Sequence, residues 1–133
     1  MNRFLDSNVL IYAYTNDDRR ERATDLIAEG GVISVQSLAE FIHVARRRPN
    51  IDGQDLFEAV KLLTDRLYVR GSVTLEVLNR GLVIAQRYKL SIHDSTLIAV
   101  ALNADCVEFL SEDMQHGLVI EDRLTIRNPF LTS

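Results

Sequence analysis

The 133-residue sequence has one cysteine, only two prolines and no low-complexity segment. A single cysteine excludes a disulfide framework and a cysteine-rich zinc site. Scarce proline and a hydrophobic content of 47% argue against a disordered chain. The longest apolar runs, such as residues 97–102, are far too short to span a membrane. The first residues lack the apolar segment of a signal peptide, so we expect a cytoplasmic protein.

The chain also lacks an excess of positive charge. Fifteen Lys and Arg residues against nineteen Asp and Glu residues give a formal net charge of −4, whereas nucleic-acid-binding domains are usually basic. However, thirteen of the fifteen cations are arginine, the residue best shaped to bind phosphate, and Arg46, Arg47 and Arg48 are consecutive. If four acids belong to one metal site, the rest of the molecule is neutral. Net charge therefore does not decide whether the partner is a nucleic acid.

Short apolar segments alternate with amphipathic ones along the whole chain. We predict strands at residues 2–6, 32–35, 68–69 and 106–110, and weaker ones at 118–120 and 124–126. We predict helices at residues 16–29, 37–48, 54–67 and 91–104, and another that Leu75, Leu78, Leu82 and Ala85 mark by their spacing. This alternation predicts one α/β domain over residues 1–133, with three α/β/α layers around a mostly parallel sheet.

Four acids occupy positions that such a fold brings to one edge of the sheet. Asp6 and Asp113 follow predicted strands, and Glu40 and Asp94 lie in the first turns of predicted helices. Ligands bind at the carboxyl ends of the strands in open α/β sheets, and helices that follow strands begin at that same edge. Carboxylates held together repel one another unless a cation intervenes. Hard oxygen ligands select Mg²⁺ or Mn²⁺, and such ions assist the cleavage of phosphodiesters.

Each acid also has a purely structural interpretation. Ser37 with Glu40, and Ser91 with Asp94, have the spacing of helix capping boxes. The segments 6–8 and 111–113 have the composition of turns and helix caps. Capping and metal binding do not exclude each other, so spacing alone leaves both interpretations open.

The four acid-bearing motifs together resemble those of the PIN-domain ribonucleases, and within them the VapC-type toxins of toxin–antitoxin pairs. The resemblance rests on FLDSNVLIY at 4–12, SLAEF at 37–41, LSIHDS at 90–95 and LSEDM at 110–114. Each motif alone is weak, whereas the four in this order are fairly specific and cover nearly the whole chain.

This resemblance implies a five-stranded parallel sheet, one or two Mg²⁺ or Mn²⁺ ions and the cleavage of RNA. It implies inhibition by a small antitoxin, and usually a homodimer. By position it makes Asp6, Glu40, Asp94 and Asp113 the catalytic metal carboxylates, and Ser7, Asn8 and Ser111 the residues that shape the site. Arg46, Arg47 and Arg48 would then hold a flanking RNA phosphate.

One feature departs from the pattern of many relatives, which carry a further acid shortly after the position of Asp113. Here residues 114–117 contain no acid, and Glu112 is the nearest spare carboxylate. A second metal would therefore be weakly held, or would arrive with the RNA phosphate.

Three other functions were weighed against this one. A haloacid-dehalogenase-type phosphatase needs a carboxyl at position 8, where this chain has Asn8. A phosphoacceptor receiver domain needs a lysine after a late strand, and neither Lys61 nor Lys89 follows one. A PIN-like RNA- or protein-binding module without catalysis stays open as the alternative.

Overall fold

The computed structural model describes residues 2–48 and 53–131, so the ends of the predicted 1–133 domain lie outside the described residues. Within those ranges the six strands are β1 (Arg3–Leu5), β2 (Val32–Ile33), β3 (Tyr68–Val69), β4 (Glu108–Leu110), β5 (Val119–Ile120) and β6 (Leu124–Arg127). The six helices are α1 (Ser7–Ala13), α2 (Arg20–Glu29), α3 (Val35–Arg46), α4 (Gly53–Arg66), α5 (Leu75–Tyr88) and α6 (Ile92–Asn103). None of these helices is long and apolar enough to cross a membrane.

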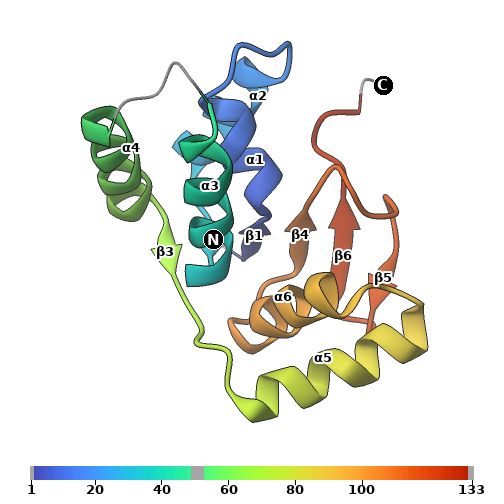
Figure 1. Cartoon of the computed structure of the whole chain (residues 1–133). Coiled ribbons are helices and arrows are strands. Elements are labelled where there is room, and N and C mark those ends of the chain that lie inside the picture. The colour runs from blue at the N-terminus through green and yellow to red at the C-terminus, as the bar shows by residue number, and fades with distance from the viewer. Residues whose placement is uncertain (1, 49–52, 132–133) are drawn as a thin grey trace.

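The strands form one sheet in the order β3-β2-β1-β4-β6-β5. The chain builds outwards from β1 to β2 and β3, then returns to place β4 on the other side of β1 (Figure 1). All neighbouring pairs are parallel except β5 and β6. The strand order therefore reverses between β1 and β4, and the carboxyl ends of these two strands border the position where α/β sheets usually bind ligands.

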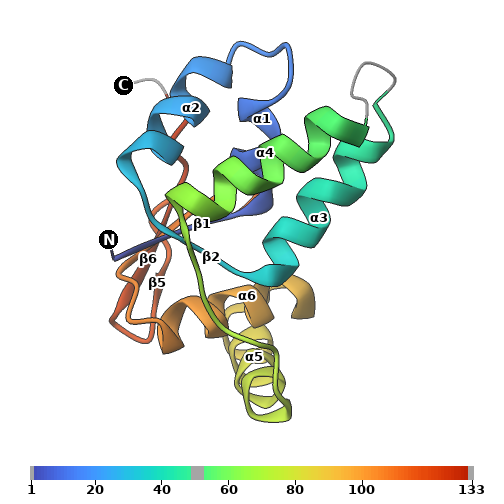
Figure 2. The same cartoon turned by 90° about the vertical axis from the view of Figure 1, so that its left-hand side faces the viewer.

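Alternating side chains of the short strands pack into two separate hydrophobic cores. Phe4 and Phe109 stack at 5.0 Å in the core beneath α5 and α6. The next residue of each strand, Leu5 and Leu110, packs into the core beneath α1, α2, α3 and α4. Figure 2 shows these two groups of helices on opposite sides of the sheet. The predicted three-layer α/β/α architecture with a mostly parallel sheet is confirmed.

The sheet has six strands rather than the five that the resemblance implies. The additional pairing is the antiparallel hairpin of β5 and β6. Its turn contains Glu121 and Asp122 with φ values of 52° and 56°, the conformation that a type I′ turn requires. Neither is the glycine or asparagine that usually marks such a turn, so the sequence indicates these strands only weakly.

The helix that Leu75, Leu78, Leu82 and Ala85 mark is α5, but its leucines do not face the core. Leu75, Leu78 and Leu82 are 73%, 41% and 48% exposed, whereas the buried side of the helix carries Val77, Gly81 and Ile84. Gly81 decides the orientation, because a Cβ at this position would lie 3.0 Å from the Cα of Thr96 on α6. The absence of a side chain lets the two helices approach closely. Leucine spacing alone could not reveal this contact.

Candidate active site

Asp6 lies at the carboxyl end of β1 and is the N-cap of α1. Its backbone N–H donates to the carbonyl of Leu110 at 3.0 Å, which ties it to the neighbouring strand β4. Its Oδ1 accepts a hydrogen bond from the backbone N–H of Ser7 at 2.7 Å, and its Oδ2 accepts one from Ser111 Oγ at 2.9 Å. The side chain is almost completely buried. Asp6 therefore caps the helix, as its structural interpretation requires, and faces the loop after β4 as well.

Ser111 connects the loop after β4 to the residues around Asp6. Its fully buried hydroxyl accepts hydrogen bonds from Asn8 Nδ2 at 3.3 Å and from the backbone N–H of Asp113 at 3.2 Å. Asn8 Nδ2 also donates to Asp113 Oδ2 at 3.2 Å. The structure thus joins Asp6, Asn8, Ser111 and Asp113 in one hydrogen-bonded cluster, to which Ser7 contributes its backbone N–H.

The electrostatics of Asp6 bring a further aspartate into this site. The pKa of Asp6 is raised from 3.8 to about 6, chiefly by burial and in smaller part by the negative charges of Asp94 and Asp113, against the lowering effect of its hydrogen bonds. Like charges and burial both disfavour the ionised form. The charges of Asp94 and Asp113 therefore act on Asp6 at the switch point of the sheet.

Asp94 and Glu40 lie on the two helices predicted to present them. Asp94 is in the first turn of α6, where its backbone N–H donates to Ser91 Oγ at 3.0 Å, so the predicted cap by Ser91 is confirmed. Glu40 lies in the second turn of α3, because the N-cap is Ser34 and not Ser37. The predicted capping box of Ser37 with Glu40 is therefore wrong. Glu40 is not among the charges that chiefly raise the Asp6 pKa.

The donor chemistry of this cluster fits a hard divalent cation. Burial and the charges of Asp94 and Asp113 both raise the pKa of the Asp6 carboxyl, and a bound cation would offset both penalties. Asn8 Oδ1 is also buried and accepts no hydrogen bond from the described residues, so the site holds an unpaired oxygen donor. Within residues 2–48 and 53–131, no three Asp, Glu, His or Cys side chains are already grouped as a metal site.

Glu112, the nearest spare carboxylate, is engaged elsewhere. It accepts hydrogen bonds from Tyr12 Oη and Arg19 Nη1, and the bond from Tyr12 is the main cause that lowers its pKa. Burial and this carboxylate raise the pKa of Tyr12 to about 12, so the hydroxyl stays protonated and donates. The sequence did not reveal the contacts of Tyr12 and Arg19 with Glu112, because these contacts span about a hundred residues of chain.

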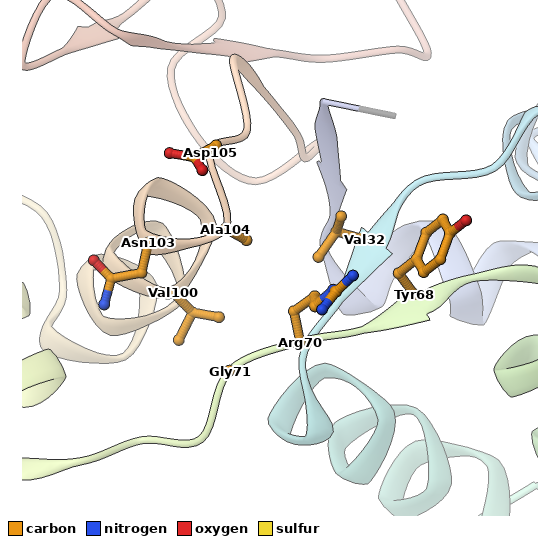
Figure 3. A pocket seen from close by; sticks show the side chains of 8 residues that line it. All are labelled: Val32, Tyr68, Arg70, Gly71, Val100, Asn103, Ala104 and Asp105. Carbon is orange, nitrogen blue, oxygen red and sulfur yellow. The ribbon is translucent and has the colours of Figure 1, made fainter.

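The hollow shown in Figure 3 measures about 700 Å³ and is lined by Tyr68 of β3, by Arg70 just after this strand and by Asn103 at the end of α6. None of the four predicted acids lines it. A hollow of about 440 Å³ lies instead on α3, the helix of Glu40, and is lined by Ala39, Ile42, His43, Arg46 and Arg47.

The hydroxyl of Ser111 sets the charge state of the site, which gives a first prediction. Its hydrogen bond lowers the pKa of Asp6, so we expect Ser111→Ala to raise that pKa above about 6. Carbon-13 NMR titration of the Asp6 carboxyl measures it. Ser95→Ala is the matched control, because Ser95 is equally buried but its Oγ has no partner among the described residues. An unchanged pKa in Ser111→Ala would show that this bond does not hold the carboxylate.

Comparison with known proteins places this geometry in a family. The model of the family described as PIN domain matches residues 3–117. No curated protein matches the chain. A toxin–antitoxin complex from Klebsiella pneumoniae has a chain similar in structure, with a TM-score of 0.72, 16% identity, and 96% of this chain and 97% of that chain covered.

Two further solved structures share the fold. VapC20 from Mycobacterium tuberculosis, described as a toxin that cleaves the sarcin–ricin loop, has a TM-score of 0.65 and 21% identity, with 84% of this chain and 91% of that chain covered. VapBC2 from Rickettsia felis, bound to a DNA fragment from its promoter, has a TM-score of 0.64 and 16% identity, with 96% of this chain and 98% of that chain covered.

Proposed function

The chain belongs to the PIN domain family, and from this premise we propose that it is a metal-dependent endoribonuclease, the toxin of a toxin–antitoxin pair. We propose that it acts as a single domain over residues 1–133. The observation that carries the proposal is the hydrogen-bonded cluster of Asp6, Asn8, Ser111 and Asp113 at the switch point of the sheet, where the charge of Asp94 also acts on Asp6. Such a cluster of acids is destabilising without a cation and suited to hold one.

In this proposal Asp6, Glu40, Asp94 and Asp113 hold one or two Mg²⁺ or Mn²⁺ ions. The bound metal supplies a water of lowered pKa as nucleophile and neutralises charge on the RNA phosphate. Ser111 holds Asp6 and the amide of Asp113 in place, and Asn8 orients the Asp113 carboxylate. Ser7 fixes the second oxygen of Asp6 through its backbone N–H. The protein residues thus bind and orient, and no side chain serves as the nucleophile.

The partners follow from the same family membership. We propose RNA as the substrate, a cognate small antitoxin as the inhibitor, a homodimer as the assembly and the cytoplasm as the location. Solved structures with this fold include toxin–antitoxin complexes. The groove between α3 and α4 is the docking surface we propose for the antitoxin, and Phe57 on α4 is 76% exposed. The exposed leucines of α5 offer an apolar surface for the homodimer.

The arginine cluster on α3 provides the proposed contact with a flanking RNA phosphate. Arg46 and Arg47 are exposed, line the hollow on α3 and form no ion pair within the described residues. Arg48 differs, because its charge adds to the lowering of the Asp17 pKa that hydrogen bonds from Arg19 chiefly cause. We therefore assign the stronger phosphate contacts to Arg46 and Arg47 and a weaker one to Arg48.

This assignment predicts the salt dependence of RNA binding. Each phosphate contact on a single strand contributes about 0.7 to the slope of log K against log salt, so replacing both Arg46 and Arg47 by Gln reduces the slope by about 1.4. Filter binding of a single-stranded uridine oligomer to the Asp94→Asn protein measures the slope without cleavage. Arg48→Gln is the matched control, with a smaller expected change. A slope that the double variant leaves unaltered would contradict the assignment.

RNA cleavage itself tests the proposed function. Total cellular RNA is incubated with the wild-type protein, with Mn²⁺ or with EDTA, and new RNA ends are mapped by sequencing. We expect discrete new ends with Mn²⁺ and none with EDTA. A protein that binds RNA but produces no new ends under either condition would favour the alternative, a PIN-like binding module without catalysis.

A further inference from the structure

Three side chains from separate segments meet beside the acid cluster. Tyr12 belongs to α1, Arg19 precedes α2 and Glu112 lies in the loop after β4. Tyr12 Oη donates to Glu112 Oε1 at 2.7 Å, and Arg19 Nη1 donates to Tyr12 Oη at 2.9 Å and to Glu112 Oε1 at 2.5 Å. The Arg19 guanidinium also lies 3.8 Å from the centre of the Tyr12 ring. We call these three residues the Glu112 clamp.

The guanidinium at the centre of the clamp is fixed on its other side by Asp17. Arg19 Nε and Nη2 each donate to the Asp17 carboxylate at 2.7 Å, and the Arg19 backbone N–H donates to it at 2.8 Å. A bidentate pair of this kind gives the planar guanidinium a defined orientation. Arg19 therefore reaches Glu112 from an anchored position. Its charge also balances that of Glu112, which would otherwise add to the repulsion beside Asp113.

Side chains from two consecutive turns of helix α1 donate hydrogen bonds to two consecutive residues of the loop after β4. Asn8 and Tyr12 are four residues apart, so they lie on one face of the helix about 6 Å apart along its axis. Asn8 donates to Asp113, and Tyr12 donates to Glu112. The bonds that hold Asp113 directly are both 3.2 Å long, and Asp113 is exposed. The shorter bonds in this loop are those of its neighbour Glu112.

We propose that the Glu112 clamp positions the carboxylate of Asp113 in the acid cluster, and that Glu112 is a positioning residue and not a metal ligand. The inference rests on the proposed function in that it takes Asp113 as a ligand of the metal. It identifies Tyr12, the last residue of the motif at 4–12, and Arg19, which lies outside the four motifs, as determinants of metal affinity. It also explains how the loop after β4 keeps its place without a further acid beyond Asp113.

Two substitutions of Glu112 separate positioning from charge. Gln keeps an oxygen that accepts from Tyr12 and Arg19 but removes the charge, whereas Ala removes both. Isothermal titration with Mn²⁺ measures affinity and stoichiometry. Loss of groups that orient metal ligands typically weakens affinity about 10- to 100-fold. We expect Glu112→Ala and Arg19→Gln to weaken Mn²⁺ binding by at least about tenfold, and Glu112→Gln to keep most of the affinity.

Arg80→Gln is the matched control. Arg80 forms an ion pair with Glu121 at 3.0 Å, with side chains 30% and 29% exposed, close to the 36% and 24% of Arg19 and Glu112. The substitution Arg80→Gln breaks a comparable ion pair away from the acid cluster and should leave the Mn²⁺ affinity unchanged. An equal loss in Arg80→Gln would assign the effect to general destabilisation and overturn the inference. Equal losses in Glu112→Gln and Glu112→Ala, with lower stoichiometry, would make Glu112 a ligand and also overturn it.

A second readout needs no metal. The Asp113 amide donates to Ser111 Oγ, so NMR hydrogen exchange of this amide reports the loop position in the metal-free protein. We expect faster exchange in Glu112→Ala than in the wild type or Arg80→Gln. Unchanged exchange would overturn the inference. A wild type that binds no Mn²⁺ while Glu112→Ala still exchanges faster would count against the proposed function and leave the clamp supported.

Discussion

The Asp94→Asn variant should lose RNA cleavage by more than about 100-fold while keeping its fold. Replacing a group that merely orients a metal ligand typically lowers metal affinity or activity about 10- to 100-fold. Asp94 is proposed as a ligand itself, so its loss should cost more. The substitution keeps the backbone N–H that Ser91 Oγ accepts, so the start of α6 is retained. The rate of RNA cleavage in Mn²⁺ measures the loss, and circular dichroism measures the fold.

The same loss is expected for Asp6→Asn, Asp113→Asn and Glu40→Gln. Asp25→Asn is the matched control, because Asp25 is an exposed acid on α2 outside the cluster, and it should cleave at the wild-type rate. Glu40→Gln is the sharpest of these tests, since Glu40 is the one proposed ligand that the structure does not couple to Asp6. Full activity in any one variant removes that residue from the site.

Asp6→Asn should stabilise the metal-free protein at pH 8 and destabilise it relative to the wild type when Mn²⁺ is saturating. The pKa of Asp6 is about 6 in the folded protein against 3.8 for the free side chain. The folded state therefore binds the proton more tightly than the unfolded state. Stability from this group is greatest below about pH 4 and is lost as the pH rises to about 6.

The size of the effect follows from the same shift. One pKa unit corresponds to 1.36 kcal/mol, so ionised Asp6 lowers the free energy of unfolding by roughly 3 kcal/mol above pH 6. The variant regains this stability but loses about 1–2 kcal/mol, because the Asn Nδ2 that replaces Asp6 Oδ2 cannot accept the bond that Ser111 Oγ donates. We expect a net gain of about 1–2 kcal/mol, measured by urea unfolding in EDTA.

The pH dependence and the metal response identify the cause of this gain. At pH 4 the gain should disappear, because the wild-type carboxyl is then protonated in the folded state. Asp25→Asn changes the net charge equally and should give no gain at either pH. A variant that is less stable than the wild type at pH 8 in EDTA would contradict the penalty that burial, with a smaller contribution from Asp94 and Asp113, places on ionised Asp6.

The arrangement of the cluster was largely predictable, because it follows from sheet topology. Asp6 and Ser111 follow two strands that pair in register, Leu5 opposite Leu110, and the carboxyl ends of such strands meet. Once these strands were located in the sequence, the proximity of Asp6 and Asp113 followed. Asn8 could be placed as well, because it lies in the first turn of the helix that Asp6 caps.

The features that the sequence did not predict depend on contacts between distant segments. The buried side of α5 is set by the close approach of Gly81 to Thr96 and not by its leucines. Helix α3 begins earlier than predicted, because Ser34, and not Ser37, accepts the capping hydrogen bond. Arg19 lies in the segment predicted as a helix at 16–29, and only the folded chain brings it to Glu112.

Thermal unfolding of the wild type and Asp94→Asn, each with and without excess Mn²⁺, tests the central claim most directly. A ligand at 100 times its dissociation constant adds about 2.7 kcal/mol to the stability of a protein that binds it only when folded. The carboxylate site predicts that Mn²⁺ raises the Tm of the wild type and leaves that of Asp94→Asn nearly unchanged. Equal Tm shifts in both proteins, or none in either, would contradict a metal site built on these acids.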